Sequence, residues 1–549
     1  MEGKMCEEEM EERTVNKEEE MEERTKGETE ILNSRNEPPE ESQKESHGVQ
    51  RELAEDRAKK TMRVPDGGWG WMVAFGAFLS SVLVLGQSFT FGILFSQYLL
   101  SEGVSSTTTC WIFSISLMMT HFMMVLVGPL TKEFGIRTVG YFGTTICVIA
   151  MFLSTFTPSP EFLYVTYSLL GGVGPGLVAS VCYTVVAPYF DKKRGRANTL
   201  LVAGSPVAQI VMMPLLRYLL DQYSFRGAAL VYSGVLMHTY IGVTFFHPLK
   251  WHLKPSEDKA QEKLQPHHGQ EEISGHPHSE NSSVSSSSLH GVGDDDGDEG
   301  NDFVKVGTDG DGGGDGQTCG VVRRLFNTFV RVGRSIITNF KLYRSLRVCI
   351  IAISFGLSSA SFLNFIMLAP FSMQASGHSL QNAAWCLSAM GIVNLLSRFV
   401  VSPLADWKKF DIRICMMLGY FLKAIAAVGF ALSDRLGFLA LWTVLFGIGL
   451  GSTISLQILV IVSYMGMELL PATYGITGIT TAICFPIAGP LIGLVRDLTQ
   501  NYEPSMYFIG SMDLVSSAMW IFMPAAVAWD NATNKCKQTS DTNQQQMDP

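Results

Sequence analysis

Apolar residues gather along this chain in runs of roughly 20 residues, six before and six after a long polar stretch. A helix of about 20 apolar residues spans the roughly 30 Å hydrocarbon core of a bilayer. The pattern therefore predicts an all-α polytopic membrane protein with about twelve transmembrane helices. The runs lie near Trp71–Leu100, Trp111–Leu130, Ile136–Phe156, Phe162–Ala187, Leu200–Leu220, Gly227–His247, Val348–Met373, Ala383–Leu404, Ile412–Ser433, Leu436–Tyr464, Tyr474–Val495 and Met506–Trp529.

The polar stretches predict how the chain is divided. Hydrophobic residues make up 47% of the sequence and the mean hydropathy is +0.19, although a Glu-rich start dilutes both values. That start has no apolar h-region, so no cleavable signal peptide is expected. We expect helical bundles at 65–249 and 347–529, each with six spans. A disordered acidic tail at 1–64, a mostly disordered loop at 250–346 and a tail at 530–549 flank them.

The central loop carries histidines between His267 and His290 and an acidic glycine tract. A calcium loop needs glycine at its sixth position, but counting from Asp294 puts Glu299 there. The ten cysteines are scattered without a CxxC pair, so the sequence predicts no metal site and no cofactor. Basic and apolar residues from Val322 to Arg347 predict an amphipathic helix on the anionic inner leaflet, with membrane lipids as its partner.

Lysine and arginine cluster on alternate connections between the runs. Cytosolic connections are enriched in these cations, so the sides bearing Lys132, Arg194 and Lys408 are predicted to face the cytosol. The opposite connections are nearly bare, with Arg226 among the few exceptions. Both termini and the central loop are then cytosolic. The sequons at Asn281 and Asn531 would not be glycosylated.

Two segments of the first half recur in the second. Gly128–Arg137 is similar to Ser402–Arg413, and Pro214–Asp221 is similar to Pro490–Asp497, both at an offset of about 275 residues. Each half is thus one copied unit of six helices. Parallel repeats of this kind place a site between the halves near the membrane midplane.

A short block, Pro65-Asp66-Gly67-Gly68-Trp69-Gly70-Trp71, stands where the polar tail meets the first apolar run. It resembles the signature that opens the first span of the monocarboxylate transporter family, a branch of the major facilitator superfamily. Tyr189, Phe190 and Arg194 lie in a segment similar to the second signature of that family. The resemblance runs from Pro65 to about Trp529 and implies the major facilitator fold.

Polar groups inside spans are the candidates for chemistry, because they are costly there. Asn394 and Arg398 are four residues apart, hence on one helical face. The arginine fork matches a carboxylate through two hydrogen bonds; alternatively, Arg398 is structural and pairs with an acid. The resemblance implies substrate binding, since the family carries such an arginine in its eighth span. Neutral candidates for binding the cargo are Gln87, Asn364 and Gln457.

Two departures from the family bear on coupling. Proton-coupled members place an aspartate four residues before the arginine and a lysine in the first span, where this chain has Asn394 and Phe89. Neither side chain titrates. The chain therefore looks more like the atypical branch, whose cargoes include aromatic amino acids, iodothyronines, creatine and carnitine. A proton route would need His121 or Asp513, and Asp513 could instead pair with Lys423.

The sequence thus predicts a plasma-membrane transporter that moves a small organic anion or zwitterion by alternating access, facilitated or weakly proton-coupled. The alternatives are a proton-coupled lactate or pyruvate symporter, and a non-transporting receptor or scaffold on the same fold. The sequence contains no nucleophile–base set of the kind that enzymes use, so an enzyme is not expected. No nucleic-acid partner is expected either. The resemblance allows a single-span ancillary glycoprotein. Arg137, Asp406 and Arg226 are assigned gating or structural roles.

Overall fold

The computed structural model describes residues 62–63, 67–190, 193–252, 254–255, 341–404, 407 and 410–533. Contacts divide the chain into two units, and the larger one, Pro65–His252 with His276–Pro549, holds every described helix. Two short strands, β1 (Met62–Arg63) and β2 (Lys254–Pro255), pair antiparallel, with Met62 opposite Pro255. The predicted amphipathic helix and the histidine-bearing loop lie largely or wholly outside the described residues.

The first half of the helical unit is built from long helices joined by short connections. Its α-helices are α3 (Trp69–Phe89), α4 (Phe91–Ser101), α5 (Ser106–Phe134), α6 (Ile136–Thr155), α7 (Gly171–Val186), α8 (Arg194–Met237) and α9 (Thr239–Thr244). A π-helix at Tyr164–Leu170 leads into α7, and 3-10 turns lie at Pro160–Phe162, Ala187–Tyr189 and Leu249–Trp251.

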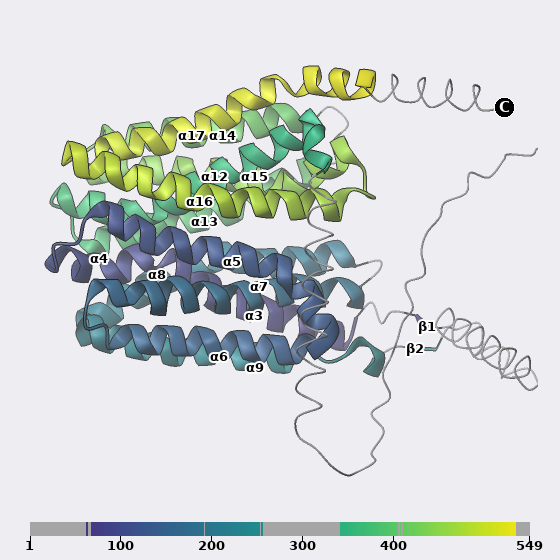
Figure 1. The fold of residues 1–549 in the computed structure, drawn as a ribbon, viewed down its shortest axis with the longest axis horizontal. Coiled ribbons are helices and arrows are strands. Elements are labelled where there is room, and N and C mark those ends of the chain that lie inside the picture. Colours follow the sequence, from purple (N-terminus) through teal and green to yellow (C-terminus); the bar gives the residue numbers. More distant parts are fainter. Residues whose placement is uncertain are drawn as a thin grey trace, which may run out of the picture. The chain divides into compact units, whose positions relative to one another are not determined.

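The second half repeats this plan. After a 3-10 turn at Lys341–Arg344 it contains α12 (Leu346–Ala375), α13 (Leu380–Leu404), α14 (Ile412–Ala431), α15 (Leu436–Met465), α16 (Leu470–Thr499) and α17 (Glu503–Ile521), and a last helix covers Met523–Thr533. Figure 1 shows the first half in purple to teal and the second in green to yellow, and their helices meet where α5 packs on α16 and α8 packs on α13.

The number of membrane crossings follows from the helix lengths. Ten described helices are long and apolar enough to cross. One of them, Gly195–Thr244, has 50 residues, or about 75 Å at about 1.5 Å per residue, which is too long for one span. Ser224 breaks it with φ 54° and ψ −175°. That break divides the helix into two segments, and the bent pair Glu503–Ile521 and Met523–Thr533 counts as an eleventh candidate span. The prediction of an all-α polytopic membrane protein is confirmed, and the exact number of twelve crossings stays a prediction.

Glycines let the repeated helices cross closely. A Cβ added at Gly172 of α7 would lie 2.5 Å from the Ser116 carbonyl oxygen of α5. A Cβ at Gly451 of α15 would lie 2.5 Å from the Asn394 carbonyl oxygen of α13. Because no side chain fits at either position, the two glycine-rich spans hold their neighbours in equivalent places in the two halves.

Successive spans alternate in direction, so the connections fall into two sets. We use the name outer end for the end of the helices that bears the connections at 101–106, 155–160, 375–380, 431–436 and 499–503. It lies opposite the Lys/Arg-rich connections, and the sequence predicts that it is extracellular.

Candidate functional site

Arg398 lies on α13, one helical turn after Asn394, and faces the first half of the molecule. Its Nε donates to Asn394 Oδ1 at 3.1 Å, and its Nη1 donates to the Val202 carbonyl oxygen of α8 at 3.0 Å. Only 8% of the residue is exposed. No described carboxylate forms an ion pair with this guanidinium. Among the described residues, Arg398 is therefore a buried cation held by neutral oxygens.

The rest of the guanidinium reaches solvent. Its Nη2 makes no hydrogen bond to described residues and is not among the buried unpaired atoms. Tyr183 of α7 is close enough to interact electrostatically with Arg398, and Tyr474 of α16 is close enough to interact with Tyr183.

Tyr183 and Tyr474 both lie deep within the helical unit, yet 38% and 44% of their surfaces are accessible. Neither tyrosine was predicted from the sequence, where the only signal was a hydroxyl inside an apolar run.

Two of the predicted neutral residues are buried with one free polar atom each. Gln87 donates from Nε2 to the Gly171 carbonyl oxygen at 3.3 Å, which leaves its Oε1 without a partner. Asn364 donates from Nδ2 to the Ala360 carbonyl oxygen at 2.8 Å, which leaves its Oδ1 without a partner. Gln457 is half-buried on α15 and has no side-chain hydrogen bond to described residues. Of the predicted set, Asn394 is the one that forms a hydrogen bond with Arg398 among the described residues.

Further unpaired groups line the contact between the halves. Both polar atoms of Gln209 on α8 are buried without a partner, and its Cβ lies 2.9 Å from where a Cβ at Gly391 of α13 would be. Ser114 Oγ on α5 is also unpaired, and a Cβ at Gly489 of α16 would collide with it. Gln209 and Ser114 were not predicted from the sequence as cargo-binding candidates. Gln209 is a glutamine inside an apolar span, which is the same signal that made Gln87 a candidate.

Lys423 and Asp513, which the sequence offered as a possible pair, form an ion pair. Lys423 Nζ of α14 lies 2.7 Å from Asp513 Oδ1 of α17, and both side chains are fully buried. Ser361 Oγ donates to Asp513 Oδ2 at 2.5 Å, and Lys423 also donates to Ser358 Oγ. The Asp513 carboxylate is thus committed to partners within the second half.

His121 lies on α5, and its Nδ1 is 2.9 Å from the Leu117 carbonyl oxygen. Its ring is 5.1 Å from that of Phe485 on α16, centroid to centroid. His121 therefore lies at the contact between the halves, whereas Asp513 lies away from it.

The signature residues meet at the start of the first span. Gly68 has φ +57°, a conformation that glycine adopts without strain. Trp69 stacks on His247 at 4.4 Å, and Trp71 packs edge-on against Phe190 at 5.1 Å. The Tyr189 hydroxyl donates to the His247 carbonyl oxygen at 2.5 Å. The two sequence signatures, about 120 residues apart, therefore build one cluster.

The predicted gating residues can be placed only in part. Arg137 begins α6 and Arg226 is exposed at the outer end. Asp66 and Asp406 lie outside the described residues, and the side chain of Arg194 is also undescribed. The gating or structural roles assigned to Arg137, Asp406 and Arg226 stay a prediction.

The halves are tied together at the outer end. Asp497, near the end of α16, accepts hydrogen bonds at the start of α5: from Ser106 N at 2.9 Å, from Thr107 N at 2.8 Å and from Thr107 Oγ1 at 2.6 Å. Nearby, Gln374 of α12 donates from Nε2 to Ser96 Oγ of α4 at 3.1 Å. Two helix pairs from opposite halves are thus bonded at this end.

Two packed halves around a buried arginine define a membrane transporter built from a repeated helical unit. The family model described as Major Facilitator Superfamily matches residues 77–527, and the chain belongs to that superfamily. A solved transporter of the POT family, in complex with a thioalcohol-conjugated peptide, has the same fold at a TM-score of 0.58 and 12% identity. That likeness covers 83% of this chain and 96% of the other.

Curated relatives narrow the comparison. Monocarboxylate transporter 3 of Gallus gallus is 25% identical over 469 residues, covering 84% of this chain and 79% of the relative. Monocarboxylate transporter 12-B of Danio rerio is 22% identical over 488 residues, covering 88% and 92%. The protein is accordingly a membrane transporter of small organic solutes.

Proposed function

We propose that this protein carries a small organic anion or zwitterion across the membrane by alternating access, and that Arg398 holds the carboxylate of the cargo. One observation carries the proposal: Arg398 is a buried cation without a carboxylate partner among the described residues, and its Nη2 still reaches solvent. A buried charge is costly unless it is paired. A cargo carboxylate supplies the missing partner through two parallel hydrogen bonds.

The neighbours of Arg398 support this role. Asn394 and the Val202 carbonyl oxygen hold two of its N–H groups, which fixes the plane of the guanidinium without neutralising it. Tyr183 and Tyr474 offer accessible rings and hydroxyl groups to the remainder of a cargo. The names of the relatives, monocarboxylate transporters, favour a carboxylate.

Transport without strong proton coupling fits the same geometry. The amide of Asn394 is bonded to Arg398 and does not titrate. A carboxylate loaded onto a permanent cation is neutralised without a proton. Proton-coupled lactate or pyruvate symport is the second candidate, and His121 favours it because its ring lies at the contact between the halves. Asp513 is a weaker proton carrier, because it is fully buried against Lys423.

The remaining proposals concern cellular placement. The distribution of lysine and arginine supports an orientation with both termini in the cytosol, and we propose the plasma membrane as the location of the protein. Membrane lipids are expected partners, and a single-span ancillary glycoprotein is a further one that the resemblance suggests.

An uptake screen with Arg398→Lys tests the function. Labelled monocarboxylates, amino acids, creatine and carnitine are offered to cells that express the wild type, Arg398→Lys or Arg217→Lys. Lysine keeps the charge but loses the fork, so Arg398→Lys should lower uptake at least about tenfold at equal surface expression. Arg217→Lys is the control, because Arg217 already pairs with Asp221. Uptake by Arg398→Lys near the wild-type rate would make Arg398 structural, and no uptake by the wild type would favour the scaffold.

A further inference from the structure

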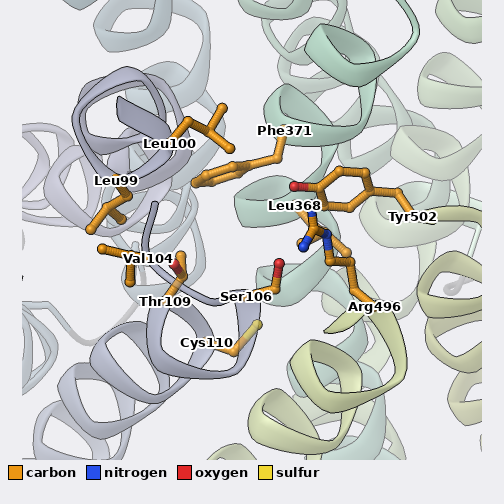
Figure 2. Close-up of a pocket in the computed structure, with 10 residues that line it drawn as sticks. All are labelled: Leu99, Leu100, Val104, Ser106, Thr109, Cys110, Leu368, Phe371, Arg496 and Tyr502. Atoms are coloured by element: carbon orange, nitrogen blue, oxygen red, sulfur yellow. The ribbon is translucent and has the colours of Figure 1, made fainter. Parts of the chain in front are cut away.

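A second cation faces a pocket at the outer end, well apart in sequence from Arg398. Figure 2 shows this pocket, where α4, α5, α12 and α16 meet and Arg496 and Tyr502 face residues from the first half. The pocket encloses ≈ 320 Å³ including its open mouth, although the free interior in this state admits only about one water. It belongs to both halves, so its walls separate when the halves rock at this end.

Arg496 brings a positive charge with unused donors to this pocket. Its Nη1 is 3.4 Å from Asp497 Oδ1, which is long for a charged hydrogen bond, and its Nε is buried without a partner. The side chain is 24% exposed. Its guanidinium carbon lies 5.0 Å from the centre of the Tyr502 ring, which holds the side chain in place.

Asp497 pairs with this arginine through one long contact. Its carboxylate accepts three hydrogen bonds from Ser106 and Thr107 at the N-terminal end of α5, each at 2.9 Å or less. The positive end of a helix dipole stabilises a carboxylate in that position. The short hydrogen bonds of Asp497 are thus to α5, and its long contact with Arg496 leaves this guanidinium able to bind a further acceptor.

The opposite wall of the pocket is apolar. Leu99, Leu100 and Val104 line it, and Figure 2 shows them on the far side of the pocket from Arg496, with Phe371 between. An arginine beside aliphatic and aromatic side chains suits a molecule with a carboxylate at one end and a short hydrocarbon body. A fully hydrated inorganic anion gains nothing from such a wall.

We propose that this pocket is an outer vestibule, in which Arg496 captures the carboxylate of an amphipathic organic acid before the acid moves on to Arg398. The proposal rests on the proposed function, because the captured molecule is the cargo itself. The vestibule opens when the Asp497 contact with α5 is released. Arg496 then sets the apparent affinity for cargo arriving from this end and leaves the maximal rate unchanged.

Binding of hexanoate tests the vestibule directly. Saturation-transfer NMR compares hexanoate with its neutral analogue hexanamide on the purified full chain. Hexanoate should bind the wild type and Arg398→Lys, and Arg496→Gln should bind it about tenfold more weakly. Arg435→Gln is the matched control, because Arg435 is an exposed arginine at the same end. Hexanamide should bind more weakly than hexanoate in every variant that keeps Arg496.

A second variant keeps the test decisive if Arg496→Gln folds poorly. Val104→Asp adds a negative charge to the opposite wall without touching Arg496, and it should also weaken hexanoate binding. Equal binding by wild type, Arg496→Gln and Val104→Asp would overturn the vestibule, as would an equal loss in Arg435→Gln.

Transport kinetics separate the vestibule from the proposed function. With a cargo from the uptake screen, Arg496→Gln should raise KM for uptake about tenfold at an unchanged maximal rate. Arg398→Lys should lower transport at least about tenfold while hexanoate still binds at Arg496. If Arg398→Lys loses transport but Arg496→Gln binds hexanoate as well as the wild type, the vestibule is refuted. The proposed role of Arg398 in cargo binding would then still stand. Hexanoate binding that depends on Arg496, in a protein that transports nothing, would refute the proposed function alone.

Discussion

The buried pair Lys423–Asp513 allows a quantitative prediction about stability. Both side chains are fully buried, and Asp513 accepts from Lys423 at 2.7 Å and from Ser361 at 2.5 Å. In Asp513→Val, the Lys423 ammonium loses its counter-charge and keeps only Ser358 as a hydrogen-bond partner among the described residues. Breaking a buried pair by removing one partner costs about 3–5 kcal/mol.

Two aromatic rings face the same ammonium. Lys423 Nζ lies 5.3 Å from the centre of the Tyr420 ring and 5.7 Å from that of Phe446. These contacts are present with and without Asp513, so they leave the difference unchanged, and Asp513→Val should destabilise the protein by about 3–5 kcal/mol. Lys423→Met should cost a similar amount, because it strands the carboxylate. The double variant removes both charges and should come close to the wild type, since a well-packed apolar pair often replaces a buried ion pair.

A double-mutant cycle measures this coupling. The four proteins are unfolded thermally in one mild detergent, and their midpoints are compared at equal lipid content. Both single variants should melt below the wild type and the double variant above either of them. Single effects that simply add in the double variant would refute the reasoning, because they would mean that the two charges do not depend on each other in the folded state.

Four further outcomes are expected. Tags at Met1 and near Ser285 should be labelled only after permeabilisation, and labelling on intact cells would contradict the predicted orientation. Uptake by the wild type should leave intracellular pH unchanged, with acidification, if any, appearing only in Asn394→Asp. Gly489→Ala should cost about 1–3 kcal/mol by overpacking, and Ser114→Ala should restore it, which melting of the double variant checks. Asp497→Asn should weaken the bonds to α5 and speed maleimide labelling of buried Cys110; an unchanged rate would argue against Asp497 as a closing contact.

Local pattern was enough to predict the parts of the site that lie within one helix. The four-residue spacing of Asn394 and Arg398 placed them on one face, and the structure joins them by a hydrogen bond. The length of the apolar runs predicted twelve crossings because bilayer thickness fixes the length of a span. The sequence also offered Lys423 and Asp513 as a pair, since an unpaired charge inside a span is costly.

Contacts between distant segments could not be predicted in this way. Nothing in the sequence around Asp497 indicates that it accepts from Thr107, 390 residues earlier. Tyr183 and Tyr474 read as ordinary members of apolar runs, and only the folded structure brings Tyr183 near enough to Arg398 to interact with its charge. The break at Ser224 has no proline or glycine at the residue itself, so its strained backbone was also not evident.

The two repeats differ at the outer end, and this difference bears on the transport cycle. Asp221 on α8 and Asp497 on α16 occupy equivalent positions in the repeated segments. Asp497 reaches across to the start of α5, whereas Asp221 pairs with Arg217 on its own helix and is 44% exposed. The equivalent bond from Asp221 would reach the start of α13. Of the two equivalent contacts between the halves, the described residues therefore form the one from Asp497 to α5 and not the one from Asp221 to α13. Since Arg496 and its pocket adjoin the Asp497 contact, we expect cargo that enters at this end to break the Asp497 contact and not one related to Asp221.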